Sequence, residues 1–239
     1  MPYRRLPNTD ISRLKAINKA IEISRKVSDS ELAFSFAILQ KLKFFQPKFE
    51  LALNNLKDAK QKQINGNKNY MEKLRKAHLY TSHFIQTVNL CITRGELKES
   101  DREFYGINNN DKTIPDLSHE SYILEWGQKI INGEKERIHN GGNPIYTPSI
   151  ANVNTNYSIF KTEYYMQKQL QKNTQRFSEE VANKRKEADN LIQRLWNEIE
   201  EYHQHESSDE RKRELCSEYG IKYILRRKER QLLLQKKLL

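Results

Sequence analysis

Apolar residues recur along most of the chain at alternating spacings of three and four residues, with polar and charged residues between them. This spacing places the apolar side chains along one side of an α-helix, and it predicts helices that each bury one narrow ridge. The last ridge, from Tyr157 to Tyr202, contains neither Pro nor Gly over about six heptads, which is typical of coiled-coil-like packing. In chain order, the pattern predicts helices at residues 11–26, 32–56, 70–94, 118–132 and 157–202.

Three interruptions separate or disturb these ridges. Pro47 lies inside the second ridge, where it removes a backbone N–H and clashes with the preceding turn, so a kink or break is expected near residues 44–47. Asn65-Gly66-Asn67 has the composition of a turn. It favours a hairpin between two helices, although one long helix with a local fault would explain the same residues. Residues 139–149 are rich in Gly and Pro and indicate a boundary or a crossover connection.

The same series of short motifs occurs twice along the chain. The helical residues Phe84-Ile85-Gln86 are followed by an acidic, serine-containing turn and then by Tyr105-Gly106-Ile107. In the same order, Leu191-Ile192-Gln193 are followed by Ser208-Asp209 and then by Tyr219-Gly220-Ile221. We interpret this as a duplication of one helix-plus-cap unit, although Ser-Asp helix starts and Tyr-Gly helix ends also recur by chance.

Two similar units that each bury one ridge tend to pack with pseudo-twofold symmetry. The sequence therefore predicts an all-α protein, an elongated helical bundle with long coiled-coil-like helices and two pseudo-symmetric halves. Residues 1–117 are expected to form the first helical half. Residues 118–150 supply a short helix and a Gly/Pro-containing connection, and residues 151–239 form the second half with a basic, leucine-rich tail.

Three segments carry a resemblance to known sequences. The opening PYRRLPNTD, the internal SHFIQTVNL at residues 82–90 and LCSEYGIKY at residues 215–223 resemble an uncharacterised family of bacterial two-repeat helical proteins of similar length. No activity accompanies that family. The resemblance therefore implies a bacterial helical protein and supplies no catalytic residues.

Composition narrows the class of protein further. The chain has 36% hydrophobic and 31% charged residues with a net charge of +11, and it contains no run of about 18 apolar residues, so no transmembrane segment is expected. Two cysteines, Cys91 and Cys216, are too few for a disulfide framework. The first residues lack the pattern of a secretory signal. These features favour a cytoplasmic location.

No arrangement of reactive residues indicates a reaction. Cys91 shares a helical face with Phe84 and Val88 and is expected in the core. Glu200 and His203 have the Glu-x-x-His spacing of di-iron bundles, but a second copy is missing. Phosphate-binding glycine loops are also missing. We therefore predict no enzyme, no cofactor and no catalytic or metal-binding residue, while an active site dispersed between the halves would leave no such pattern. The histidines, none in a zinc-binding spacing, are His78, His83, His119, His139, His203 and His205.

The C-terminal tail is the candidate site for partner binding, because its basic and leucine residues would make an amphipathic helix. We expect a non-catalytic structural or protein-interaction module that acts through helical packing surfaces and binds a protein partner or a second copy. Contact of the tail with a membrane surface is less expected. The alternative is a nucleic-acid-associated protein that uses the basic N-terminal half. The candidate tail residues are Arg226, Arg227, Leu232, Leu233, Leu234, Leu238 and Leu239.

Overall fold

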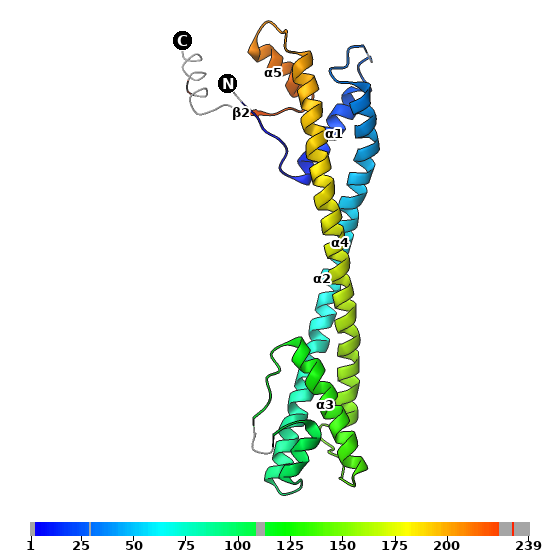
Figure 1. The fold of residues 1–239 in the computed structure, drawn as a ribbon, viewed down its shortest axis with the longest axis vertical. Coiled ribbons are helices and arrows are strands. Elements are labelled where there is room, and N and C mark those ends of the chain that lie inside the picture. Colours follow the sequence, from blue (N-terminus) through cyan, green and yellow to red (C-terminus); the bar gives the residue numbers. More distant parts are fainter. Residues whose placement is uncertain (1–2, 29, 109–112, 225–230, 232–239) are drawn as a thin grey trace. The chain divides into compact units, whose positions relative to one another are not determined.

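The protein is all-α, as the sequence predicts, and its two longest helices pack together (Figure 1). The computed structural model describes residues 3–28, 30–108, 113–224 and 231. A two-residue strand β1 (Tyr3–Arg4) pairs antiparallel with β2 (Tyr223–Ile224). The helices are α1 (Asp10–Ile23), α2 (Phe36–Thr93), the 3-10 helix η1 (Glu99–Tyr105), α3 (Glu120–His139), α4 (Ile150–Tyr202) and α5 (Asp209–Glu218).

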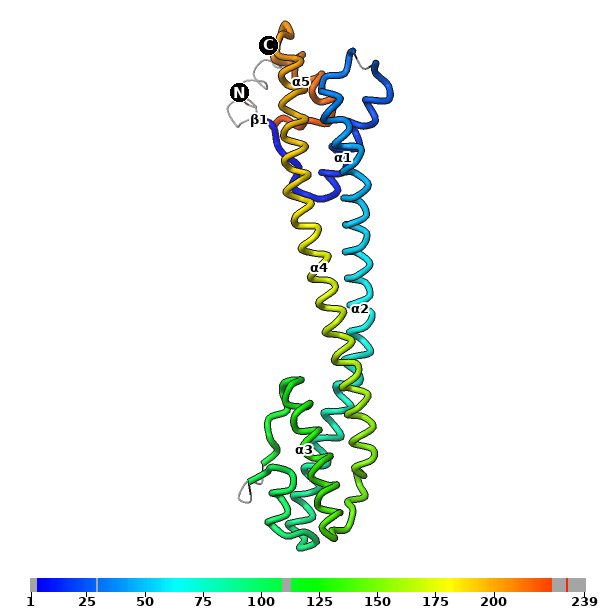
Figure 2. The backbone as a smooth tube through the Cα atoms, turned by 45° about the vertical axis from the view of Figure 1, so that its right-hand side comes forward, coloured from blue at the N-terminus to red at the C-terminus, as the bar shows by residue number. Residues whose placement is uncertain are grey.

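The chain divides into two compact units that interleave in sequence. Unit 1 comprises residues 1–58 and 175–239, and unit 2 comprises residues 59–174. Both divisions fall inside long helices, because the start of α2 lies beside the end of α4 in unit 1, and the end of α2 lies beside the start of α4 in unit 2 (Figure 2). The expected halves, residues 1–117 and 151–239, follow chain order and therefore differ from these units. The expected connection, residues 118–150, lies within unit 2.

Unit 1 is built on one apolar core formed by α1, the first part of α2, the last part of α4 and α5. Thr9 caps the start of α1: its side chain accepts a hydrogen bond from the Ser12 backbone N–H at 3.2 Å, and the Ser12 hydroxyl accepts one from the Thr9 backbone N–H at 3.1 Å. Fully buried members of this core include Ile17, Leu42, Phe49, Ile192, Leu195, Trp196, Ile199 and Cys216.

Three helix ends or breaks expected from the sequence are wrong. α2 continues as one helix through Pro47 and through Asn65-Gly66-Asn67, so no break occurs near residues 44–47, the favoured hairpin does not form, and the alternative of one long helix is confirmed. α3 likewise continues through Asn132-Gly133 to His139. In both cases the glycine permits close packing instead of a turn. A Cβ at Gly66 would lie 2.8 Å from Leu170 Cδ1 on α4, and a Cβ at Gly133 would overlap the carbonyl oxygen of Phe104.

The two Tyr-Gly-Ile motifs have the same local structure in their respective units. Each follows a short helix, η1 or α5, and each glycine has a positive φ, 69° for Gly106 and 88° for Gly220. The flanking Tyr and Ile side chains are buried in both motifs. This likeness supports the interpretation of a duplication, which stays a prediction.

Candidate interaction surface

The first part of α2 carries apolar side chains on two of its sides. Leu42, Phe45 and Phe49 are buried in the core of unit 1. Phe36, Phe44 and Leu51 instead are 61%, 68% and 60% exposed. Because a helix turns by about 100° per residue, these three exposed side chains lie within about 80° of each other around the helix axis. The same sector includes Gln40 and Pro47, which are exposed as well. We call these five residues the α2 exposed face.

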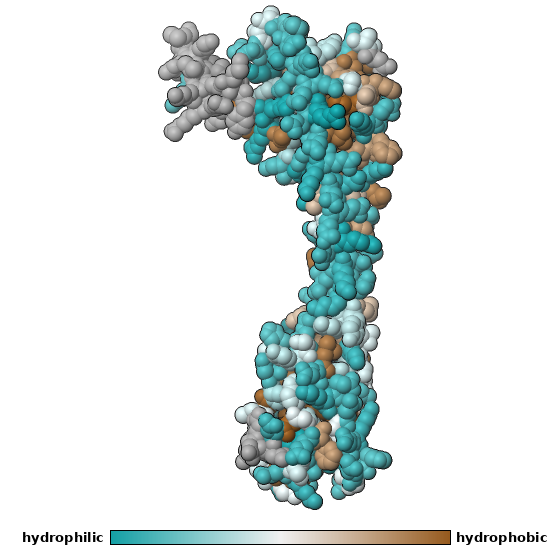
Figure 3. Space-filling model, viewed as in Figure 1, coloured by the Kyte–Doolittle hydropathy of each residue, from teal (hydrophilic) through white to brown (hydrophobic). Residues whose placement is uncertain are grey.

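The α2 exposed face is a continuous feature of unit 1. Its members follow each other at spacings of four, four, three and four residues, which is the spacing of a helix-packing ridge. Figure 3 shows apolar side chains gathered along the outer edge of this part of α2. Scattered single exposed apolar residues are normal on proteins, whereas a contiguous apolar patch marks an interaction site.

Lysines flank the α2 exposed face on both sides. Lys41 and Lys48 lie along one edge, and Lys43 lies along the other with Glu50. The Lys48 ammonium is 3.4 Å from the centre of the Phe44 ring, a cation–π contact that leaves most of the ring exposed. Among the residues that the structure describes, Lys41, Lys43 and Lys48 form no ion pair. The exposed face is therefore apolar apart from Gln40, and three lysines and one glutamate flank it.

The sequence pattern did not identify this face, because it assigns one buried ridge to each helix. Phe44 and Phe45 are adjacent in sequence, and both fit a spacing of three and four residues. Only the position of the neighbouring helices decides which of the two is buried. An available signal was the excess of large apolar residues between residues 36 and 53, which is more than one ridge can use.

The predicted tail site has no structural test. Its residues Arg226, Arg227, Leu232, Leu233, Leu234, Leu238 and Leu239 all lie outside the described residues.

Several arginines and lysines that could otherwise contact nucleic acid are paired with carboxylates within the chain. Arg185 donates two hydrogen bonds of 2.7 Å to the Asp10 carboxylate. The Arg4 guanidinium lies 2.9 Å from a Glu200 carboxylate oxygen, and Lys76 lies 3.0 Å from Glu72. Cations held by internal carboxylates have less positive charge to offer to phosphates. The nucleic-acid alternative stays a prediction that these pairs do not favour.

The thiols and histidines show no reactive arrangement in the described part of the chain. Cys216 is fully buried in unit 1, and burial raises the pKa of its thiol. Glu200, the carboxylate of the Glu-x-x-His pair, accepts a 2.7 Å hydrogen bond from the Tyr223 hydroxyl and pairs with Arg4. Within the described ranges, no three His, Cys, Asp or Glu side chains approach closely enough to hold a metal ion.

Unit 2 contains a buried ionic cluster that the sequence did not reveal. The Glu134 carboxylate has no solvent exposure and lies beside Arg137, which is 3% exposed. Arg137 donates to Glu134 through Nη2 at 2.9 Å and through Nε at 3.0 Å. The Tyr105 hydroxyl and the Ile145 backbone N–H donate to the same carboxylate.

This cluster is suited to holding segments together. Arg137 also donates a 2.7 Å hydrogen bond to the Asn143 carbonyl, so the cluster ties the segment after α3 to η1 and to α3 itself. Burial is the main reason why the pKa of Tyr105 is raised. Because each charged or hydroxyl group of the cluster is hydrogen-bonded to another member, the cluster offers no free acid or base for chemistry.

Comparisons with protein-family models, with curated protein sequences and with solved structures found no match. A search of the described residues for a helix with the length and apolarity required to cross a bilayer also found none.

Proposed function

We propose that this protein is a non-catalytic interaction module whose α2 exposed face binds an amphipathic, acidic helix of a protein partner. The observation that carries the proposal is the exposure of Phe36, Phe44 and Leu51 on one side of α2. A helix that places its own apolar ridge on this face would bury these side chains. Each large apolar side chain contributes about 1.5–3 kcal/mol when it is fully buried, and these side chains have about two thirds of that area to bury.

Charge supports an acidic partner over a second copy. Two α2 exposed faces brought together would oppose Lys41, Lys43 and Lys48 of one copy to the same lysines of the other, with Glu50 as the one acid among them. Like charges at a contact oppose association, and opposite charges favour it. Glutamates along the edges of a partner helix would pair with these lysines.

The proposal is tested with two synthetic helical peptides of the same leucine ridge, one with glutamates at its edges and the other with lysines. Binding of labelled peptide to the full chain is measured by fluorescence anisotropy. We expect the glutamate peptide to bind and the lysine peptide to bind far more weakly. The variant Phe44→Gln/Leu51→Gln should lose about 2 kcal/mol of binding free energy, which is about 30-fold in affinity.

Ile64 supplies the matched control. It lies on the same helix, is 65% exposed and is outside the α2 exposed face, so Ile64→Gln removes a similar apolar area elsewhere. This variant should bind the glutamate peptide as the unaltered chain does. Equal binding of both peptides, no binding of either, or equal losses in both variants would each contradict the proposal. A shift to dimer in sedimentation that Phe44→Gln abolishes would identify a second copy as the occupant instead.

A further inference from the structure

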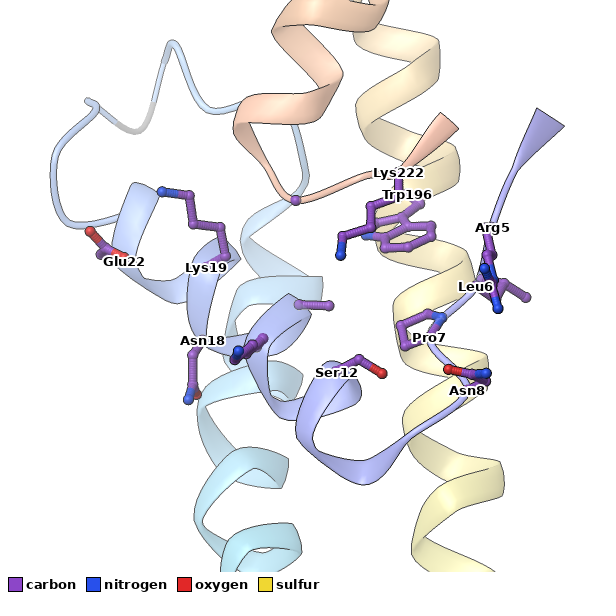
Figure 4. Close-up of a pocket in the computed structure, with 13 residues that line it drawn as sticks. Arg5, Leu6, Pro7, Asn8, Ser12, Asn18, Lys19, Glu22, Trp196 and Lys222 are labelled. Atoms are coloured by element: carbon purple, nitrogen blue, oxygen red, sulfur yellow. The ribbon is translucent and has the colours of Figure 1, made fainter. Parts of the chain in front are cut away.

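Unit 1 contains a pocket of about 640 Å³ that shares no lining residue with the α2 exposed face. The segment after β1 supplies one wall, α1 a second, and the residues before β2 a third (Figure 4). The Arg5 backbone N–H donates a 2.8 Å hydrogen bond to the Lys222 carbonyl, which fixes the first and third walls to each other. Trp196 of α4 lines the interior.

The interior of this pocket is mostly apolar, whereas its rim is positive. Leu6, Pro7 and Ala16 contribute apolar surface beside the Trp196 ring. The rim carries the side chains of Arg5, Lys15, Lys19 and Lys222, all of which are exposed.

One carboxylate, that of Glu22, also lines the pocket. It is engaged by the Lys26 ammonium at 2.7 Å, and this hydrogen bond lowers the pKa of Glu22. Within the described residues, Arg5, Lys15 and Lys222 have no such partner. The rim therefore has a net positive charge that the protein itself does not neutralise.

The Trp196 indole lies in the wall of the pocket, and its polar atom has no partner in the described part of the chain. Trp196 is 1% exposed, and its indole N–H is buried with no acceptor among the described residues. Figure 4 shows the indole ring beside Lys222, with Pro7 and Ser12 nearby. A buried donor without an acceptor costs about 1–3 kcal/mol.

We propose that this pocket binds a small amphipathic anion, with its aromatic or aliphatic body over Leu6 and Pro7 beside Trp196 and its anionic group between Lys15 and Lys222. Aromatic and apolar floors with a few convergent polar groups are the usual composition of small-molecule sites. A neutral apolar molecule would satisfy the floor and leave the cations unused. A small hydrophilic anion would satisfy the rim and leave the floor unused. The combination selects an amphipathic anion.

The test uses 8-anilinonaphthalene-1-sulfonate, an aromatic sulfonate, and the neutral N-phenyl-1-naphthylamine as its uncharged counterpart. Affinity is measured by dye fluorescence, with the full chain in excess. The sulfonate should bind more tightly than the neutral dye. Lys15→Gln and Lys222→Gln should each weaken sulfonate binding by about threefold, the size expected for an exposed ion pair. Both lysines are exposed, so these variants retain the fold.

The site is located by the indole N–H signals in a proton–nitrogen NMR spectrum. The chain has two tryptophans, so Trp126→Phe assigns the remaining signal to Trp196. Addition of the sulfonate should shift the Trp196 signal and leave that of Trp126, in unit 2, unchanged. A shift confined to Trp126, an unmoved Trp196 signal, or equal affinity for both dyes would overturn the proposal.

Two further variants separate this pocket from the α2 exposed face. Lys43→Gln removes an exposed lysine of unit 1 outside the pocket, and Phe44→Gln removes part of the exposed face. Both should bind the sulfonate as the unaltered chain does. Loss of sulfonate binding in Phe44→Gln together with unchanged binding in Lys15→Gln would place the dye on α2 and refute the pocket.

Discussion

Substitution of Arg137 by Met removes the cation that compensates the Glu134 carboxylate in unit 2. The carboxylate has no solvent exposure, so it cannot regain hydration when the guanidinium is lost. Two hydrogen bonds from Arg137 to Glu134 and one to the Asn143 carbonyl disappear together. Removal of one partner from a buried ion pair costs about 3–5 kcal/mol, a large part of the roughly 5–15 kcal/mol that stabilises a typical domain.

A second substitution at the same site tests whether the change in unfolding free energy reverses its sign. Glu134→Gln by itself leaves the Arg137 guanidinium buried without a counter-charge, so it should destabilise the protein by about 3 kcal/mol. In the Arg137→Met background, the same Glu134→Gln change removes the uncompensated charge and keeps an oxygen that can accept from the Tyr105 hydroxyl. There it should restore about 2 kcal/mol.

The assay is urea unfolding followed by far-ultraviolet circular dichroism, with the free energy of unfolding extrapolated linearly to water. Arg94→Met serves as the control, since Arg94 is exposed and lies 4.0 Å from Glu96 at the surface, where a pair contributes about 0–1 kcal/mol. A loss below about 1 kcal/mol in Arg137→Met, or a Glu134→Gln effect of the same sign in both backgrounds, would refute the interpretation of the cluster as a buried, mutually compensated pair.

Gly133→Ala should destabilise the protein by about 2 kcal/mol in urea unfolding, because the new methyl group meets the Phe104 backbone. Gly66→Ala meets only the side-chain ends of Leu170 and Gln167 and should change stability by less than about 1 kcal/mol. Cys216, which is buried and has a raised thiol pKa, should react with a thiol reagent only after unfolding; rapid reaction of both thiols in the native chain would contradict this. The raised pKa of Tyr105 means that the unfolded chain releases this proton first. The contribution of Tyr105 to the stability of the folded state is therefore complete below about pH 10 and declines above it. Tyr105→Phe should make the melting temperature fall less steeply above that pH than in the unaltered chain.

The helical class and most helices could be predicted from the sequence, since the ridges of α2 and α4 have the correct period over many turns. The interruptions were predicted less well. Gly66 and Gly133 have the sequence context of turns, but their role is set by Leu170 and Phe104, which approach from other segments. The residues next to a glycine in sequence do not reveal which distant segment will pack against it.

The candidate sites depend on tertiary arrangement even more strongly. The pocket combines residues 5–22 with Trp196 and residues 220–222, which are joined only after β1 and β2 pair. The lysines of its rim are indistinguishable in sequence from those on any solvated helix. The same holds for Phe44, whose exposure follows from the position of its neighbours and not from its own pattern.

The interleaved order of the two units has a consequence for biosynthesis. Residues 1–58 leave the ribosome first, yet Phe45 and Phe49 share their core with Leu195 and Ile199, which are translated much later. Residues 59–174 form one uninterrupted stretch and can complete their contacts while the nascent chain is still growing. The apolar ridge of residues 36–53 therefore stays without its α4 partner until residues 175–199 have been translated.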